Sequence, residues 1–297
     1  MPEKTAHDFD QELLILFDAY VHGAVDRRAF LERAAKYAVG GVTAAMLLEQ
    51  LSPKFAEAQL VRLDDRRISQ KYVEFDSPAG YGKGRGYLAH PTGATGPQPG
   101  VLVIHENRGL NPHIEDIARR LAVVNFVAFA PDALFPLGGY PGDEDRARTL
   151  FRDLDQTKTR QDFIAAAGFL RALPACTGRV GAVGFCYGGG MVNFLATRLG
   201  SDLSAGVAFY GSAPNLEDVP DIKAPLLIQS AEVDERINAS WPAYEEALKA
   251  ARVTYERHLY PGTQHGFNNN TTPRYDAAAA ALAWERTIAF LNRHVRG

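Results

Sequence analysis

The sequence predicts an α/β domain in which helices cover both faces of a mostly parallel sheet. The chain has 297 residues, 46% of them hydrophobic, so it is long enough to bury a large core. From residue 71 onward, short apolar runs alternate with segments of helical periodicity. Most of these runs are continuous rather than alternating, as expected for strands that are buried on both faces.

The expected elements follow one another along the chain. Residues 71–75 and 85–90 predict an opening hairpin. Buried strands are expected at the short apolar runs bounded by Gly, Pro or Asp: 101–105, 126–130, 180–185, 205–210, 225–229 and 254–260. Helices are expected between and after them, at residues 113–124, 159–173, 189–199, 241–251 and 274–294. We assign residues 60–297 to one domain and residues 1–59 to a helical N-terminal extension.

Charge and cysteine content exclude several classes of protein. The 32 basic and 35 acidic residues leave a net charge of −3 with no block of like charge, so nucleic acid is not an expected partner. The two cysteines, Cys176 and Cys186, belong to no Cys/His cluster at metal-ligand spacing. We therefore expect neither a disulfide framework nor a metal site.

The N-terminal extension has two interpretations. After an amphipathic helix at residues 9–22, the pair Arg27-Arg28 resembles a twin-arginine motif, residues 38–48 a short apolar signal region, and residues 56–58 a small-x-small cleavage site. We favour export to the periplasm on this basis. The alternative is a cytoplasmic protein whose helical hairpin packs on the catalytic domain or on a second copy of the chain, in a homodimer. The apolar run has 11 residues, too few for a stable membrane span.

Cys186 is the first candidate for a reactive side chain. The segment Gly184-Phe185-Cys186-Tyr187-Gly188 follows a predicted strand and opens a predicted helix, and it has the form of a nucleophile elbow with cysteine in place of serine. The flanking glycines are expected where side chains would collide in a tight turn. The positive end of the following helix favours thiolate over thiol. Cys176, in contrast, is expected to be a small core residue.

A cysteine nucleophile needs a base and a group that orients the base. His265 follows the last predicted strand, and Asp234 follows the strand before it, so both are expected at the same sheet edge as Cys186. Glu232 is the nearest rival of Asp234. Of the other histidines, His113 and His294 lie in helical patterns and are expected to be surface or cap residues.

These motifs resemble the dienelactone hydrolases, an α/β-hydrolase-fold family with a Cys-Asp-His triad. The resemblance covers residues 71–295 and rests on G-F-C-Y-G-G at Cys186, the Asp234 loop and H-G-F at His265. It also includes the segment I-H-E-N-R-G, in which it implies that Glu106 contacts the resting thiol and helps to form the thiolate. An alternative for Glu106 is an ion pair with Arg108 or another arginine. The backbone amides of Asn107 and Tyr187 are expected to form the oxyanion hole.

The resemblance implies the type of reaction more firmly than it implies the substrate of this protein. Better-known members hold a substrate carboxylate with two arginines. Arg146 and Arg148 are candidates for one of them, while the other position is occupied here by Asn269, with Arg274 as a spatial substitute.

The implied function is hydrolysis of a small ester or lactone through a thioester on the cysteine, without a metal or organic cofactor. Two other functions stay open at this stage. One is a non-catalytic member of the fold that binds small ligands. The other is a redox-active thiol protein, which the absence of a C-x-x-C motif disfavours.

Overall fold

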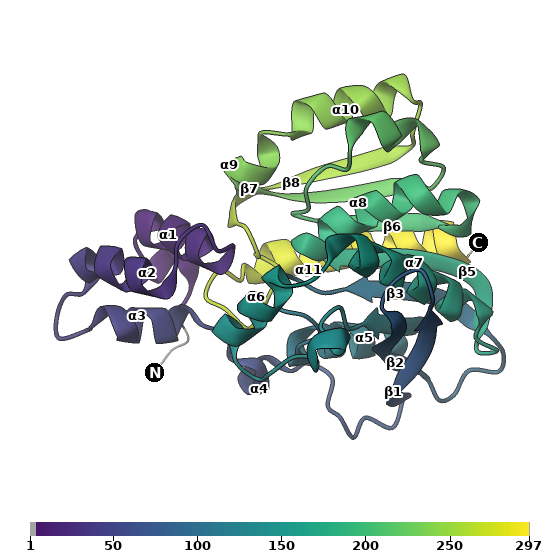
Figure 1. Ribbon diagram of the computed structural model, residues 1–297, viewed down its shortest axis with the longest axis horizontal. Helices are drawn as coiled ribbons and strands as arrows, with labels where there is room; N and C mark the ends of the chain where they lie inside the picture. Colours follow the sequence, from purple (N-terminus) through teal and green to yellow (C-terminus); the bar gives the residue numbers. More distant parts are fainter. Residues whose placement is uncertain (1–3, 297) are drawn as a thin grey trace.

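The central element of the fold is an eight-stranded sheet with the order β1-β2-β4-β3-β5-β6-β7-β8 (Figure 1). The computed structural model describes residues 4–296. The strands are β1 (Ile68–Ser77), β2 (Gly82–Pro91), β3 (Gln98–Ile104), β4 (Val127–Pro131), β5 (Cys176–Phe185), β6 (Ala205–Phe209), β7 (Leu226–Val233) and β8 (Tyr255–Gln264). Strands β1 and β2 form the expected antiparallel hairpin, and β2 also pairs antiparallel with β4. All other neighbours pair in parallel, which confirms the predicted sheet.

Helices cover both faces of this sheet. Helices α7 (Gln156–Ala172), α8 (Tyr187–Leu199) and α10 (Trp241–Ala250) pack with one hydrophobic cluster, and α5 (Pro112–Val123) and α11 (Ala277–Leu291) pack with the other. The central strand β3 therefore has apolar contacts on both sides, and Val101 through Ile104 are fully buried. This double burial explains why its sequence is a continuous apolar run.

The helix boundaries follow local capping. Helix α5 starts where Asn111 accepts a hydrogen bond from the backbone of Ile114 and Pro112 occupies the first turn. Helix α11 starts at Ala277, three residues later than predicted, because the Asp276 side chain caps it at the backbone of Ala279. Two short helices, α6 (Glu144–Arg152) and α9 (Glu235–Asn238), lie in connecting segments for which the sequence predicted no helix.

The prediction for His113 was wrong. Its side chain is 3% exposed, although it lies in the first turn of α5. Burial, together with the charge of Arg120, lowers the pKa of this imidazole to about 3. His113 is therefore a neutral interior residue. The helical periodicity of these residues did not indicate that Asn270, from a distant loop, lies beside the His113 side chain.

The N-terminal residues form a helical unit with a hydrophobic cluster of its own. Helices α1 (Gln11–Val21), α2 (Arg27–Ala34) and α3 (Ala44–Leu51) enclose Phe17, Phe30, Leu48 and other apolar side chains. The unit lies to one side of the sheet, with α1 near α6 and β7–α9 (Figure 1). The short α4 (Phe55–Ala58) leads from it toward the core.

The arginine pair and the apolar stretch assigned to export are part of this helical unit in the structure, and the predicted cleavage site at residues 56–58 lies in α4. Arg27 and Arg28 open α2, and Arg27 pairs with Asp145 of α6 at 3.0 Å. The apolar stretch 38–48 is interrupted by Gly40 and Gly41, both with positive φ, before α3 begins. Across residues 4–296, none of the helices combines the length and apolarity needed to cross a membrane.

Candidate active site

Cys186 lies at the sharp turn between β5 and α8. Its φ of 55° is in the left-handed region, which is strained for a residue with a side chain. A Cβ added to Gly184 would lie 2.0 Å from the carbonyl oxygen of Gly188, and one added to Gly188 would lie 2.1 Å from that of Ile104. Both glycines are therefore required for this turn, as the sequence motif predicted.

Asp234 and His265 meet at the same edge of the sheet, directly after β7 and β8. His265 Nδ1 lies 2.6 Å from Asp234 Oδ2, and both residues are buried. Glu232 is exposed and accepts a hydrogen bond from the backbone of Gly262 instead. The structure thus brings Asp234, and not its rival, to the imidazole.

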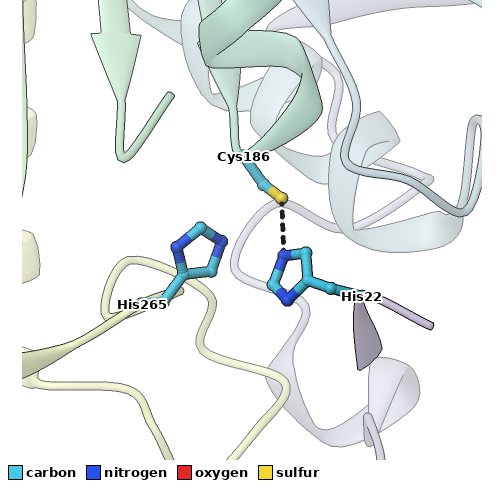
Figure 2. A group of neighbouring side chains, drawn as sticks. All are labelled: His22, Cys186 and His265. Carbon is cyan, nitrogen blue, oxygen red and sulfur yellow. Dashed lines mark hydrogen bonds between the residues drawn. The ribbon is translucent and has the colours of Figure 1, made fainter. Parts of the chain in front are cut away.

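The other nitrogen of His265 is available on the side of the thiol. His265 Nε2 is buried and has no hydrogen-bond partner among the described residues. It belongs to a group with Cys186 Sγ and His22 Nε2 in which all three ligand atoms lie within 4.8 Å of one another (Figure 2). The order Asp234–His265–Cys186 is therefore that of an orienting carboxylate, a base and a nucleophile.

The electrostatics of the site favour a thiolate and an imidazolium. Burial opposes ionisation of Cys186, but the imidazoles of His265 and His22 outweigh it and hold the pKa of the thiol well below its ordinary value. Burial likewise opposes the charge on His265, yet Cys186 and the hydrogen bond to Asp234 raise its pKa to about 10. Each charge thus stabilises the other across a site that contains little water-exposed surface.

Glu106 does not form the ion pair that was its alternative. Its Oε2 accepts a hydrogen bond from Asn269 Nδ2 at 3.1 Å, while Arg108 pairs with Glu144 at 3.4 Å. Burial and the nearby Cys186 raise the pKa of the Glu106 carboxyl. Glu106 is therefore a carboxylate poised to hold a proton close to the thiol.

The two amides expected in the oxyanion hole come from neighbouring segments. Tyr187 is the first residue of α8, and Asn107 follows the end of β3 by three residues. The close approach of Gly188 to the Ile104 carbonyl places these two segments side by side. The Tyr187 ring packs against His105 and Phe151, which fixes the start of the helix.

The residue that sequence reasoning missed is His22, at the end of α1. Its Nε2 lies 3.2 Å from Cys186 Sγ, and its Nδ1 lies 2.8 Å from the backbone oxygen of Asp18 and 3.3 Å from that residue's carboxylate. Figure 2 shows its ring beside that of His265, with the two ring centroids 4.7 Å apart and the sulfur of Cys186 facing both. The spacing of Asp18 and His22, four residues apart on one helix face, was the available signal. Nothing in the sequence indicated that this helix face contacts the thiol of Cys186, which is 164 residues away along the chain.

The arginines expected to bind a substrate carboxylate differ in their surroundings. Arg146 is exposed and lines neither of the cavities described below. Arg148 is buried and donates to the backbone oxygen of Tyr20 and to Asp145. Arg274 is buried and pairs with Asp18 at 2.9 Å. Arg148 and Arg274 are thus both engaged by the N-terminal unit.

The N-terminal unit also accepts hydrogen bonds from two side chains next to Glu106 in the sequence. The backbone oxygen of Val21 accepts hydrogen bonds from Asn107 Nδ2 at 3.1 Å and from Arg108 Nη2 at 2.9 Å. The end of α1 is therefore fixed to the core through polar contacts on both sides of His22.

Two cavities lie where α1 meets the core. One, of about 310 Å³, is lined by residues that include Tyr20, Glu106, Asn107, Arg108 and Asn269. The other, of about 660 Å³, is lined by residues that include Asp18, Asp234, Arg236 and His265. Arg274 lines both cavities, Tyr20 at the end of α1 lines the first, and Asp18 of the same helix lines the second, so α1 and Arg274 lie between the two spaces.

Comparisons with known proteins agree on the core domain. A model of the dienelactone hydrolase family matches residues 85–295, and a model described as YqhI-like matches residues 1–36. A putative hydrolase fragment, YghX of Escherichia coli, is 47% identical over 116 residues, which are 39% of this chain and 99% of that protein. Carboxymethylenebutenolidase 1 of Cupriavidus pinatubonensis is 29% identical and covers 74% of this chain and 95% of its own length.

A solved structure has the same fold. The putative dienelactone hydrolase from Klebsiella pneumoniae superposes with a TM-score of 0.67 at 28% identity, over 76% of this chain and all of that one. The dienelactone hydrolase model begins within β2, so the N-terminal helical unit lies outside that match.

We predict that replacing His22 by Asn raises the pKa of the Cys186 thiol by about 1 pH unit or more, because a hydrogen-bonding partner of the thiolate is lost. The measurement is the pH dependence of thiolate absorbance and of alkylation rate, in a Cys176→Ser background that leaves one thiol. His7→Asn, at an exposed position of the same unit, is the control. An unchanged midpoint in the His22 variant would contradict the role of this contact.

Proposed function

Because the chain belongs to the dienelactone hydrolase family, a family of carboxylic ester and lactone hydrolases, we propose that it cleaves its substrate through a thioester on Cys186. The observation that carries this proposal is the alignment of Asp234, His265 and Cys186 at one sheet edge, with a thiol whose pKa is lowered.

The acylation step uses the thiolate as nucleophile. Cys186 Sγ forms a bond to the carbonyl carbon, and the carbonyl electron pair moves to oxygen, which the backbone N–H groups of Asn107 and Tyr187 stabilise. When the oxyanion collapses, the C–O bond of the ester breaks. The leaving oxygen takes the proton from His265 Nε2. With a lactone the leaving oxygen stays attached to the acyl group.

The deacylation step returns the site to its starting state. Water gives a proton to His265 and adds to the thioester carbon, and the C–S bond then breaks to release the acid and the thiolate. Asp234 holds the imidazole through Nδ1, so that Nε2 faces the reaction in both steps. In the resting state the thiol proton has already passed to His265 Nε2. Glu106, whose pKa is raised, is proposed to take the proton of any Cys186 that is still a thiol and to pass it on to His265.

The test of this mechanism is trapping of the acyl-enzyme. Rapidly quenched reactions with an activated aryl ester should show a mass increase on the peptide that contains Cys186 and none on that with Cys176. Cys186→Ser should lower kcat/KM by about a thousandfold or more, because the hydroxyl is not ionised by this site. Cys176→Ser is the matched control. Acylation of Cys176 alone, or turnover without any acylated cysteine, would contradict the proposal and revive the ligand-binding or redox alternatives.

We propose that the enzyme discriminates weakly in favour of substrates that carry a carboxylate. Asn269 stands at one anion-binding position and contacts Glu106, while Arg148 and Arg274 are engaged by the N-terminal unit. Loss of a charge-assisted hydrogen bond to a substrate carboxylate costs about 1.5 to 3 kcal/mol of binding free energy, which is roughly ten- to a hundredfold in affinity.

The corresponding prediction concerns kcat/KM for a carboxylated lactone and a neutral ester of similar size. The two values should lie within about tenfold of each other. Asn269→Arg should raise the value for the carboxylated lactone and leave that for the neutral ester little changed. If the wild-type enzyme already strongly prefers the carboxylate, and Arg274→Ala removes that preference, then Arg274 binds the anion and our interpretation of Asn269 is wrong.

The cellular destination stays a proposal from the sequence, namely twin-arginine export to the periplasm. An Arg27→Lys, Arg28→Lys pair should retain the protein in the cytoplasm of its native host while the purified enzyme keeps its activity. Cell fractionation measures the first effect and an esterase assay the second. A wild-type protein that stays in the cytoplasm with residues 1–58 intact would support the packing alternative. The domain boundary at residue 60 and a homodimeric assembly likewise stay predictions.

A further inference from the structure

We propose that His22, Cys186 and His265 form a binding site for a borderline divalent cation of the Zn²⁺ type, and that the bound ion reversibly blocks the hydrolase. The site is assembled from two parts of the chain, because His22 comes from the N-terminal helical unit and the other two residues come from the core (Figure 2). It therefore exists in the chain that keeps residues 1–58, and cleavage at residues 56–58 would remove it. Inhibition rests on the proposed use of Cys186 and His265 in catalysis, whereas binding of the ion does not.

The donor atoms and their spacing fit such an ion. Thiolate sulfur and imidazole nitrogen are the ligands that Zn²⁺ prefers, and a tetrahedral site separates them by about 3.5 Å. His22 Nε2 is already 3.2 Å from Cys186 Sγ, and all three donors lie within 4.8 Å of one another. Small side-chain rotations therefore suffice to bring them around one ion. Three protein ligands leave a fourth position for water, as in open zinc sites.

Both imidazoles are also oriented for ligation through Nε2. Asp234 holds Nδ1 of His265, and Asp18 holds Nδ1 of His22, so each ring has the outer carboxylate that commonly supports a zinc-bound histidine. His265 Nε2 is buried and has no partner among the described residues, although it points toward the sulfur. A cation between the rings would give this atom the partner that it lacks.

The binding step exchanges protons for the ion. The Cys186 thiolate contributes one electron pair, and each Nε2 contributes another once any proton on it has passed to solvent. The carboxylates of Asp18 and Asp234, which contact the two imidazoles, favour the cation. Two guanidinium groups oppose it: Arg274 pairs with Asp18, and Arg236 Nη2 lies 3.2 Å from His22 Nε2.

The ion would remove both groups that the thioester mechanism needs. A sulfur bound to the metal cannot attack a carbonyl carbon, and a His265 Nε2 bound to it cannot carry a proton. The ion would also tie α1 to the core through His22. Chelation would restore the thiolate and the free imidazole together.

The experiment measures binding and activity separately. Full-length protein, reduced and stripped with a chelator, is titrated with Zn²⁺ by calorimetry and with Co²⁺ by absorption. We expect one ion per chain, a sulfur-to-cobalt charge-transfer band that Cys186→Ser abolishes, and loss of esterase activity in step with occupancy. His22→Asn should weaken binding by about tenfold or more, and Asp18→Asn by about ten- to a hundredfold. Circular dichroism verifies that each variant is folded.

Matched variants make the result specific to this cluster. His7→Asn, which removes an exposed histidine of the same unit, should bind like the wild type. Arg236→Gln should bind at least as tightly, because an opposing charge is removed. Binding that is unaffected by His22→Asn, a cobalt spectrum without a sulfur band, or full activity at full occupancy would each overturn the proposal. Failure to acylate Cys186 with intact metal binding would instead refute the thioester mechanism alone.

Discussion

The close approach of the α8 backbone to the end of β3 is the constraint on which the site depends. Because Gly188 has no side chain, its Cα can lie against the carbonyl of Ile104, and Gly184 can lie under the first turn of the helix. This packing holds Cys186 in a left-handed conformation that it would not adopt by itself. It also places the Cys186 thiol, the Tyr187 amide and the segment after β3 around one small volume. The backbone strain at Cys186 is thus offset by the packing of β3 and β5, whose side chains are buried by helices on both faces of the sheet.

Polar groups from the loops after β7 and β8 complete this arrangement. Asp234 and His265 are both buried, and the carboxylate orients the imidazole through Nδ1. Cys186 and this hydrogen bond raise the pKa of His265 despite its burial, so that the imidazolium and the thiolate stabilise each other. Removing one partner would leave a buried charge without compensation. The three side chains therefore act as one electrostatic unit rather than as three separate groups.

The part of the structure that the sequence could predict is the part that depends on local pattern. Continuous apolar runs at residues 101–105 and 180–185 predicted buried strands, and the glycine spacing at Cys186 predicted the turn, because each pattern depends on neighbours along the chain. The burial of His113 and the position of His22 depend on contacts between distant segments. An Asp18–His22 pair on a helix face has the same pattern whether that face meets water or a thiol. Only the packing of the N-terminal unit distinguishes the two.

That packing also bears on how tightly a substrate can be held. The end of α1 already uses the side chains of Asn107, Arg108 and Arg148 through the backbone oxygens of Tyr20 and Val21, so it behaves as a tethered competitor for these donors. A substrate that needed the same donors would bind only the fraction of molecules in which α1 had withdrawn. Its apparent dissociation constant would then be the intrinsic one divided by that fraction. If α1 withdraws in this way, the buried pair of Arg274 with Asp18, which fixes the helical unit to the core, raises the substrate concentration that is needed for half-saturation.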